Sequence, residues 1–491
     1  MSRCGRISTL RFHLSQSLAA AAIGVGLICG CTPHAQAASD TAAATQQPAP
    51  QAEPDPPEAL GDERPGQPPR PLDGDFLQLF HKERQDLKDK GITFSLHERR
   101  EIWTDVSGGG HQGFSYDGLT IAKLNLDLDA LLGWKGGEFF ASGFDIHGHG
   151  PSRALVGNQQ LVSNIEATPS IKLYDLWLDQ TLLDGKVSIR TGQEGANDEM
   201  MVTAYGGLFL NSSFGFPGMP AADLPSGGPN YPLASPFVRA LYSPTDKITI
   251  VGAVYTEDPA QPGVGDPQAR DRNGTAFRLN DHTLGFAELW YTPDAKSPPD
   301  LPTTYKLGAW YATGNFADRR LDSAGGLLAN PASSGSPLQH AGDWAVYGVV
   351  DQMVWRQPGT DDDGIGVFAM VMAGPGNRNL SNLYAEAGMN WRGPFKERKD
   401  DIFGLAVAYL GISPAARQYG NDLVAFGQAN AGYASNETVI EATYQAPVTD
   451  WLTLQPDLQY VVNPNAGIPN NFGARPLPNA LVIGMRVTIR L

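Results

Sequence analysis

Alternation of apolar and polar side chains is the strongest pattern in this chain, and it is clearest at the C-terminal end. In the segment LPNALVIGMRVTIRL every second residue from Leu481 to Leu491 is apolar, and the positions between them include Arg486 and Arg490. Because successive side chains on a strand point to opposite faces, the pattern predicts a strand with one apolar and one charged face. A soluble sandwich and a membrane barrel would both produce such a strand.

Similar segments recur from residue 92 onward, as in KLNLDLD at 123–129 and LTLQPDLQYVV at 452–462. Short alternating runs separated by turn residues, in a chain with 56 glycines, predict an all-β protein. We predict sixteen strands, at residues 92–106, 117–132, 137–148, 170–181, 186–192, 236–243, 247–256, 284–292, 304–313, 344–356, 364–373, 383–392, 402–411, 437–447, 451–462 and 480–491.

The connections between these segments alternate in length. Connections after the even-numbered segments are short, as at 133–136, 182–185 and 448–450, whereas several after odd-numbered segments are long, as at 149–169 and 193–235. Short turns at one rim and long loops at the other are typical of outer-membrane barrels, which must close because an open sheet edge in hydrocarbon leaves backbone groups unpaired. We therefore predict an all-β, 16-stranded antiparallel transmembrane β-barrel whose charged face lines an aqueous channel.

Between Gly91 and Leu491 the chain carries seven distinctive segments: GITFSLHERREIWTDVSGG, YDGLTIAKLNLDLDALLGWKGGEFF, SNIEATPSIKLYDLWLDQTLLDGKVSIRTGQ, YGGLFLNSSFGFPGMP, NYPLASPFVRALYSP, LTLQPDLQYVVNPNAG and ALVIGMR. Together they resemble the carbohydrate-selective porins of the OprB family. The resemblance implies an outer-membrane porin that admits glucose and related sugars by facilitated diffusion, with no cofactor and no enzymatic activity. It also suggests that segment 193–235, with Asn197, Asp198, Glu199, Asn211 and Ser212, folds into the lumen and narrows the pore.

Alternation assigns a set of side chains to the lumen. On the strand at 170–181, Tyr174, Leu176 and Leu178 are expected to face outward. Donors and acceptors of both signs can replace the hydration of a neutral sugar, and a Trp ring can offer a flat face to a pyranose. The alternative for each charged residue is a solvated or ion-paired wall position, and for Trp177 an aromatic girdle. The residues expected to line the constriction are Asp175, Trp177, Arg190, Arg239, Glu288, Glu386, Asp457 and Arg486, together with Gln455 and Arg490.

The first 90 residues differ in composition from the rest. Residues 1–37 combine three arginines, an apolar stretch and Ala35-Gln36-Ala37, which predicts a secretory signal peptide and export. Cys31, in the run ICGC, is an alternative lipidation site. Residues 38–73 are rich in Ala and Pro and predict a disordered linker, and the spacing of apolar residues predicts a short periplasmic helix at 74–90.

Net charge and candidate ligands narrow the choice of partners. A net charge of -16 argues against nucleic acid as a partner. Small carbohydrates, outer-membrane lipid with lipopolysaccharide, and two further copies in a homotrimer are the partners expected of such a porin. The runs His147-Gly148-His149 and Asp361-Asp362-Asp363-Gly364 are interpreted as polar loops rather than metal sites, because neither has the further ligands that a site needs.

Other functions fit parts of the pattern. A secreted β-rich protein that binds or degrades carbohydrate would be water-soluble, with its apolar strand faces in a sandwich core. A structural or adhesive barrel would insert into the membrane without conducting. A general diffusion pore would conduct without sugar selectivity.

Overall fold

The computed structural model describes residues 83–293, 301–360 and 363–490. The predicted signal peptide, with Cys31, and the predicted linker lie outside these ranges, as do residues 74–82, 361–362 and Leu491. Residues 83–88 are helical and lead into the first strand.

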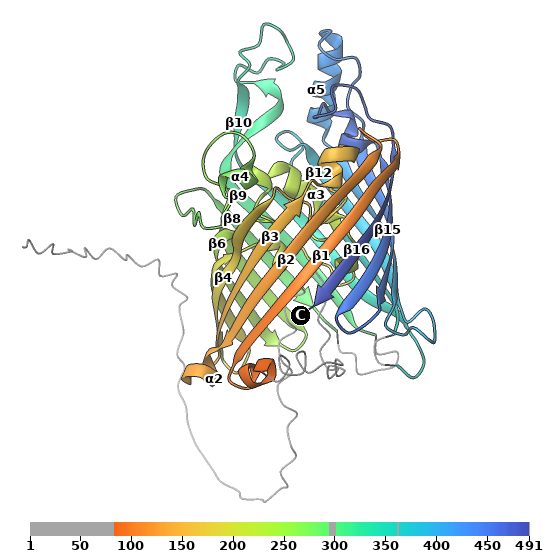
Figure 1. Ribbon diagram of the computed structural model, residues 1–491. Helices are drawn as coiled ribbons and strands as arrows, with labels where there is room; N and C mark the ends of the chain where they lie inside the picture. Colours follow the sequence, from red (N-terminus) through yellow and green to blue (C-terminus); the bar gives the residue numbers. More distant parts are fainter. Residues whose placement is uncertain (1–82, 294–300, 361–362, 491) are drawn as a thin grey trace, which may run out of the picture. The chain divides into compact units, whose positions relative to one another are not determined.

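The described residues form a closed barrel of sixteen antiparallel strands (Figure 1). Each strand pairs with its neighbours in chain order, and β1 closes the barrel against β16, where Trp103 lies opposite Gly484. The predicted fold class is therefore confirmed. The strands are β1 (Ile92–Ser107), β2 (Gly113–Asp127), β3 (Gly137–Gly148), β4 (Ser170–Leu182), β5 (Val187–Glu194), β6 (Ser235–Thr245), β7 (Ile248–Thr256), β8 (Thr283–Tyr291), β9 (Thr303–Asp322), β10 (Pro337–Arg356), β11 (Gly364–Ala373), β12 (Ser381–Arg392), β13 (Ile402–Ile412), β14 (Asn436–Pro447), β15 (Leu452–Val462) and β16 (Ala480–Arg490).

Short helical elements occur in the connections. They are α2 (Leu128–Leu132), η1 (Ser152–Val156), η2 (Ala196–Asp198), η3 (Gly206–Leu208), η4 (Ser212–Phe214), α3 (Gly218–Asp223), η5 (Pro225–Gly227), α4 (Pro267–Arg270), α5 (Pro414–Ala425) and η6 (Pro464–Gly467). Of the helices in the described ranges, none is long and apolar enough to cross a membrane.

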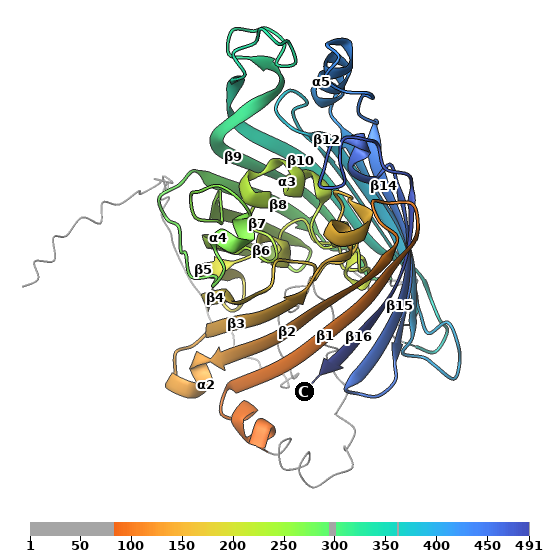
Figure 2. The same ribbon diagram turned by 45° about the horizontal axis from the view of Figure 1, so that its top comes forward.

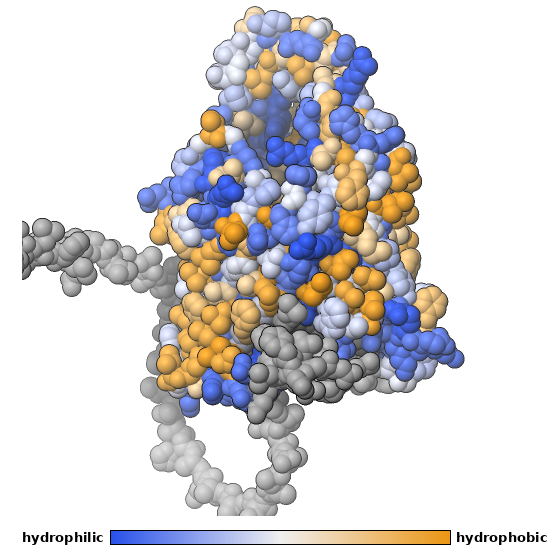
Figure 3. Space-filling view, in the orientation of Figure 1, coloured by the Kyte–Doolittle hydropathy of each residue, from blue (hydrophilic) through white to orange (hydrophobic). Residues whose placement is uncertain are grey.

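Side chains alternate between the outer wall and the lumen along the strands. On β16, Ile483 is 48% exposed and Met485 36% exposed, whereas Val482 is fully buried and Arg486 is 6% exposed. Figure 3 shows apolar side chains spread over the lower part of the wall. The C-terminal pattern thus separates a lipid-facing surface from a polar lumen, as outer-membrane barrels require.

The predicted bounds of three strands, β2, β9 and β10, were wrong by several residues. The second strand ends at Asp127, whose carboxylate accepts hydrogen bonds from the backbone N–H groups of Asp129 (2.9 Å) and Ala130 (3.1 Å) and so starts helix α2. Strands β9 and β10 are longer than predicted and project from the rim as a hairpin beside α5 (Figures 1 and 2). An ion pair between Arg320 Nε and Asp422 Oδ2, at 2.6 Å, joins the hairpin to α5.

Strand β4 contains a β-bulge that changes which residues face the lumen. The pairing of β3 with β4 shifts between Ala141 and Gly143, so β4 accommodates one extra residue there. Tyr174 is consequently buried on the lumen side beside Asp175 instead of facing lipid with Leu176. The prediction of an outward-facing Tyr174 was therefore wrong, because a bulge interrupts the two-residue period of a strand.

Candidate functional site

Two loops from the long-loop rim fill much of the lumen. The loop between β5 and β6 (195–234) folds inward, as the resemblance suggested, and Figure 2 shows its helix α3 within the barrel mouth. Met200, Phe209 and Phe214 of this loop are buried in one apolar cluster with the wall residues Tyr347 and Phe368. The loop is therefore packed against the inner wall rather than lying loose above it.

The loop between β3 and β4 (149–169) also enters the lumen, which the sequence analysis did not predict. Its backbone is joined to the β5–β6 loop by hydrogen bonds from Asn164 N to the Leu210 carbonyl (2.7 Å) and from Ser212 N to the Leu161 carbonyl (2.9 Å). The side-chain amide of Gln459, on β15, donates to the carbonyl of Val162 (2.8 Å). The two loops thus form one structure that is held across the barrel.

Wall carboxylates hold this loop structure by accepting backbone N–H groups. Glu441 Oε1 accepts from Leu210 N (2.6 Å), and its Oε2 accepts from Asn211 N (2.9 Å). Glu288, which we expected to line the constriction, accepts from Met201 N (2.8 Å). A buried loop must find partners for its backbone donors, and these carboxylates provide them. Glu288 therefore contacts the loop directly.

A charged cluster lies where β4, β5 and β6 meet. Arg190 Nε is 3.0 Å from Asp179 Oδ2, and Arg190 Nη1 is 3.5 Å from Glu194 Oε2. Arg239 Nε is 2.7 Å from Glu199 Oε2, and Arg239 Nη2 is 3.4 Å from Asp179 Oδ2. All five side chains are buried. Each guanidinium is thus matched by two carboxylates, which limits the net field that the cluster exerts on the lumen.

Trp177 does not present a free ring face. The Phe140 ring stacks on it at 4.9 Å from the β3 side, and the Arg190 guanidinium lies over it at 3.9 Å from the β5 side. The whole residue is only 7% exposed. The expectation that this indole stacks on a pyranose ring therefore does not fit the geometry, because both of its faces are covered. Asp175, its neighbour on the same face, accepts a hydrogen bond from the Ser142 hydroxyl (2.6 Å).

The other predicted lumen residues lie on separate strands. Glu386 on β12 accepts a hydrogen bond from the Tyr384 hydroxyl (2.6 Å), and Asp457 on β15 accepts from the Gln459 amide (3.0 Å). Arg486 on β16 is paired with Glu101 on β1. The structure thus brings Asp175, Trp177, Arg190 and Arg239 together on β4–β6, and it leaves Glu288, Glu386, Asp457 and Arg486 distributed around the wall.

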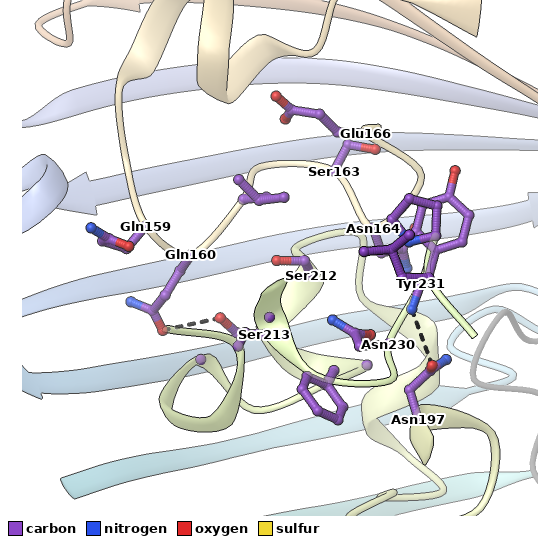
Figure 4. A pocket seen from close by; sticks show the side chains of 18 of the residues that line it. Gln159, Gln160, Ser163, Asn164, Glu166, Asn197, Ser212, Ser213, Asn230 and Tyr231 are labelled. Carbon is purple, nitrogen blue, oxygen red and sulfur yellow. Dashed lines mark hydrogen bonds between the residues drawn. The ribbon is translucent and has the colours of Figure 1, made fainter. Parts of the chain in front are cut away.

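The two infolded loops, together with Gln268 of α4, line a polar pocket of about 350 Å³ (Figure 4). Such a volume lies within the range of roughly 300–1,000 Å³ that small-molecule sites occupy. Side-chain amides and hydroxyls dominate its lining, and they can both donate and accept hydrogen bonds. The polar lining residues are Gln159, Gln160, Ser163, Asn164, Glu166, Asn197, Ser212, Ser213, Ser226, Asn230, Tyr231 and Gln268.

Several of these side chains are fixed by hydrogen bonds within the pocket wall. Asn197 Oδ1 accepts from the Tyr174 hydroxyl (2.9 Å). It also accepts from Tyr231 N (3.2 Å), and Gln160 Oε1 accepts from the Ser213 hydroxyl (3.1 Å) (Figure 4). The pocket therefore has a preformed lining, to which the bulge at Tyr174 contributes.

Glu166 is the one acidic residue of this lining. Its carboxylate accepts backbone hydrogen bonds from Ser152 N (3.0 Å) and Arg153 N (3.0 Å) and so fixes the start of the β3–β4 loop. Burial raises the pKa of Glu166 to about 7, although these two hydrogen bonds act in the opposite direction. The pocket can therefore lose its negative charge near neutral pH.

Sequence reasoning placed Asn197 and Ser212 in the narrowing loop, but it missed the part of the site that comes from 149–169. The signal was present in the run NQQLVSN at 158–164, which is rich in amides and hydroxyls and lies in a long connection. Length alone did not show that this connection turns inward.

A closed sixteen-stranded barrel with an apolar outer wall and a polar lumen narrowed by loops defines an outer-membrane porin. The family described as "Carbohydrate-selective porin, OprB family" matches residues 111–491, and the chain belongs to this family. It is 26% identical over 431 residues to Porin B of Pseudomonas aeruginosa, an alignment that covers 82% of this chain and 88% of that protein.

Solved structures of Pseudomonas putida OprB share the fold. The high-pH structure matches with a TM-score of 0.74 at 21% sequence identity, covering 84% of this chain and 97% of the other. The low-pH structure matches with a TM-score of 0.50 at 18% identity, covering 84% of this chain and 96% of the other. The protein is accordingly a carbohydrate porin of the outer membrane, a channel rather than an enzyme.

Proposed function

We propose that the protein conducts small uncharged sugars, glucose and its relatives, and that the pocket between the two infolded loops is where they first bind. The observation that supports this proposal is the pocket lining, in which amides and hydroxyls greatly outnumber the single carboxyl group of Glu166, because a sugar that leaves water needs both donors and acceptors in return. Binding in such a site is weak, since no charged pair or metal adds to it, and weak binding suits a solute that must leave again.

The charged cluster on β4–β6 forms the next part of the proposed path. Arg190 and Arg239 are paired with carboxylates at 2.7–3.5 Å, so an ion gains little by entering. A polyol, by contrast, can exchange hydrogen bonds with the edges of these pairs. In this proposal Trp177 positions Arg190, and Asp175 belongs to the same wall.

In this proposal the remaining predicted lumen residues do not contact the sugar at its first binding site. Glu288 holds the β5–β6 loop, whereas Glu386, Asp457 and Arg486 line the wall elsewhere. We also propose that the outer wall contacts lipopolysaccharide and that three barrels associate as a homotrimer.

The test is single-channel conductance in a planar bilayer, titrated with glucose, maltose and arabinose. We expect ohmic steps that glucose blocks in a saturable manner. Steps without any effect of sugar would indicate a general diffusion pore, and insertion without conductance would indicate a structural barrel.

The substitution Asn230→Ala tests whether glucose blocks the channel by binding in this pocket. Asn230 lines it, and among the hydrogen bonds of the described residues none uses the Asn230 side chain to hold a loop, so the change leaves the loop contacts in place. We expect the glucose concentration for half-block to rise about 2- to 10-fold, which is the effect of one lost hydrogen bond. Asn430→Ala, at an exposed position after α5, is the matched control and should leave the block unchanged.

A further inference from the structure

The pocket between the infolded loops has an apolar part beside its amides and hydroxyls. Its apolar lining consists of two aromatic side chains, Tyr231 and Phe216, and of Leu161, Pro232 and Leu233. A site that combines an aromatic ring with amide groups suits a ligand that has both apolar and polar surfaces. Glucose in its pyranose form is such a ligand, because its hydroxyls lie around the edge of the ring and C–H groups cover the two faces.

Hydrogen bonds hold Tyr231 and the residue after it in place. The Tyr231 hydroxyl donates to the carbonyl of Ile165 (2.9 Å), and its backbone N–H donates to Asn197 Oδ1 (3.2 Å, Figure 4). Lys172, buried on β4, donates from Nζ to the carbonyl of Pro232 (2.8 Å). The ring is therefore fixed before a ligand arrives, so a ligand that packs against it pays little to order this segment.

The ring of Tyr231 differs from that of Trp177 in what covers it. Phe144 and Tyr174 contact it with centroid distances of 5.8 and 6.2 Å, but their planes are inclined to it by 45° and 58°. Among the described residues no aromatic ring stacks flat on Tyr231, and no cationic side chain lies over it. Because Tyr231 is only partly buried and lines the pocket, part of its ring is open to a ligand.

We propose that Tyr231 is the surface against which the sugar ring packs, and that the pocket therefore binds cyclic pyranoses in preference to open-chain polyols. Glucitol, the open-chain polyol that corresponds to glucose, carries hydroxyls of the same kind. It has no flat face, however, and it loses several bond rotations on binding. Amides that bind hydroxyls would not by themselves separate the two compounds. The inference rests on the proposed sugar pocket and adds the class of compound that the pocket selects.

Phe216, the other aromatic residue of the lining, is less suited to this role. Its side chain is only 4% exposed, and it belongs to the apolar cluster that packs the β5–β6 loop against the inner wall. Replacing it would change the position of the loop as well as the lining. Tyr231 is therefore the ring to test.

Single-channel current in a planar bilayer tests the preference, first in the unchanged protein. Glucose, methyl β-glucoside and glucitol are added separately, and their concentrations for half-block are compared. We expect glucose and methyl β-glucoside, whose ring cannot open, to block at similar concentrations, and glucitol to require about 10-fold more. Equal block by glucose and glucitol would overturn the inference and leave the proposed sugar pocket in place. Absence of block by all three compounds would overturn the proposed function and the inference together.

Replacing Tyr231 with Leu tests whether its ring is the source of the preference. We expect the half-block concentration of glucose to rise toward that of glucitol, and that of glucitol to stay nearly the same. A loop that is merely loosened would weaken both compounds alike, so the ratio of the two concentrations is the decisive readout. Tyr242→Leu is the matched control: Tyr242 is 47% exposed on the outer wall of β6, and its loss should leave the ratio unchanged. A parent-like ratio in Tyr231→Leu would contradict the inference.

Tyr231→Phe keeps the test decisive if the leucine variant does not fold. This change keeps the ring and removes only the hydrogen bond to the Ile165 carbonyl. We expect the ratio of the glucitol and glucose concentrations to remain that of the parent. A ratio that falls to about one in Tyr231→Phe would assign the preference to the hydroxyl and overturn the role of the ring.

Discussion

The Arg190 guanidinium lies 3.9 Å from the centre of the Trp177 ring, while Phe140 stacks on the same indole at 4.9 Å. The indole is thus held between a ring and a cation. Its contact with Arg190 helps to direct that guanidinium toward Asp179 and Glu194, which lie 3.0 and 3.5 Å from it. The geometry makes Trp177 a positioning residue of the lumen wall.

Replacing Trp177 with Ala should therefore affect stability more than sugar binding. Loss of a buried indole is expected to lower the free energy of unfolding by about 3–5 kcal/mol, measured by denaturant titration in detergent with circular dichroism. The glucose block should weaken less than in Asn230→Ala. Trp177→Phe, which keeps a ring beneath Arg190, should recover part of the stability. A variant of normal stability that has lost the glucose block would show instead that the indole binds sugar.

The strands could be predicted from the sequence because a barrel separates two solvents. Lipid on one side and water on the other impose a two-residue period that runs through whole strands such as β15 and β16. Local departures from that period could not be predicted in this way. Tyr174 turns inward because of a one-residue bulge, and only the partner strand reveals it. The start of α2 could have been predicted from the sequence, because Asp127 is its N-cap and Asp is a preferred N-cap residue.

The candidate site was harder to predict because loops build much of it. Periodicity tells which face of a strand meets the lumen, but it does not tell whether a long connection turns inward or outward. Glu288 was correctly placed inside the barrel, yet the loop that occupies the lumen uses its carboxylate. The same holds for Glu441, which accepts two loop N–H groups. A carboxylate that faces the lumen can therefore accept hydrogen bonds from the backbone N–H groups of an infolded loop as well as from a solute.

Glu441→Ala should loosen the loops that narrow the pore. The change leaves the N–H groups of Leu210 and Asn211 without their acceptor, at a cost of about 1–3 kcal/mol for each buried donor. We expect a lower free energy of unfolding, and a larger and noisier open-channel current as the β5–β6 loop becomes mobile. Glu397→Ala, in the exposed turn between β12 and β13, is the control and should behave as the parent does. An unchanged current in a destabilised variant would show that this contact does not set the pore width.

Tyr174→Phe should alter the pocket through a single hydrogen bond. The variant keeps the ring that stacks on Phe144 at 4.5 Å but loses the hydroxyl that donates to Asn197 Oδ1 at 2.9 Å. The expected loss of stability is about 0.5–1.5 kcal/mol. Because Asn197 lines the pocket and would keep only Tyr231 N as a donor to its Oδ1, the loss of this bond should also change the glucose concentration for half-block. Tyr409→Phe, on the far side of the barrel in β13, is a control that should leave the block as it is. A block that is identical in Tyr174→Phe and the parent would argue that Asn197 does not contact sugar.

Glu166 should make the stability of the protein depend on pH near neutrality. Burial raises its pKa from the ordinary value of 4.5 to about 7, so the folded state keeps a proton that the unfolded state releases. The contribution of this group to stability is therefore greatest below about pH 4.5 and falls as the pH rises to about 7, by roughly 3 kcal/mol in total. Unfolding in detergent is measured at about pH 5 and about pH 8, and Glu166→Gln should lose less stability between the two than the parent does. Glu397→Gln, at an exposed position, should follow the parent. Equal losses in the parent and in Glu166→Gln would show that the carboxyl of Glu166 does not titrate in this range, and that the pocket keeps its charge.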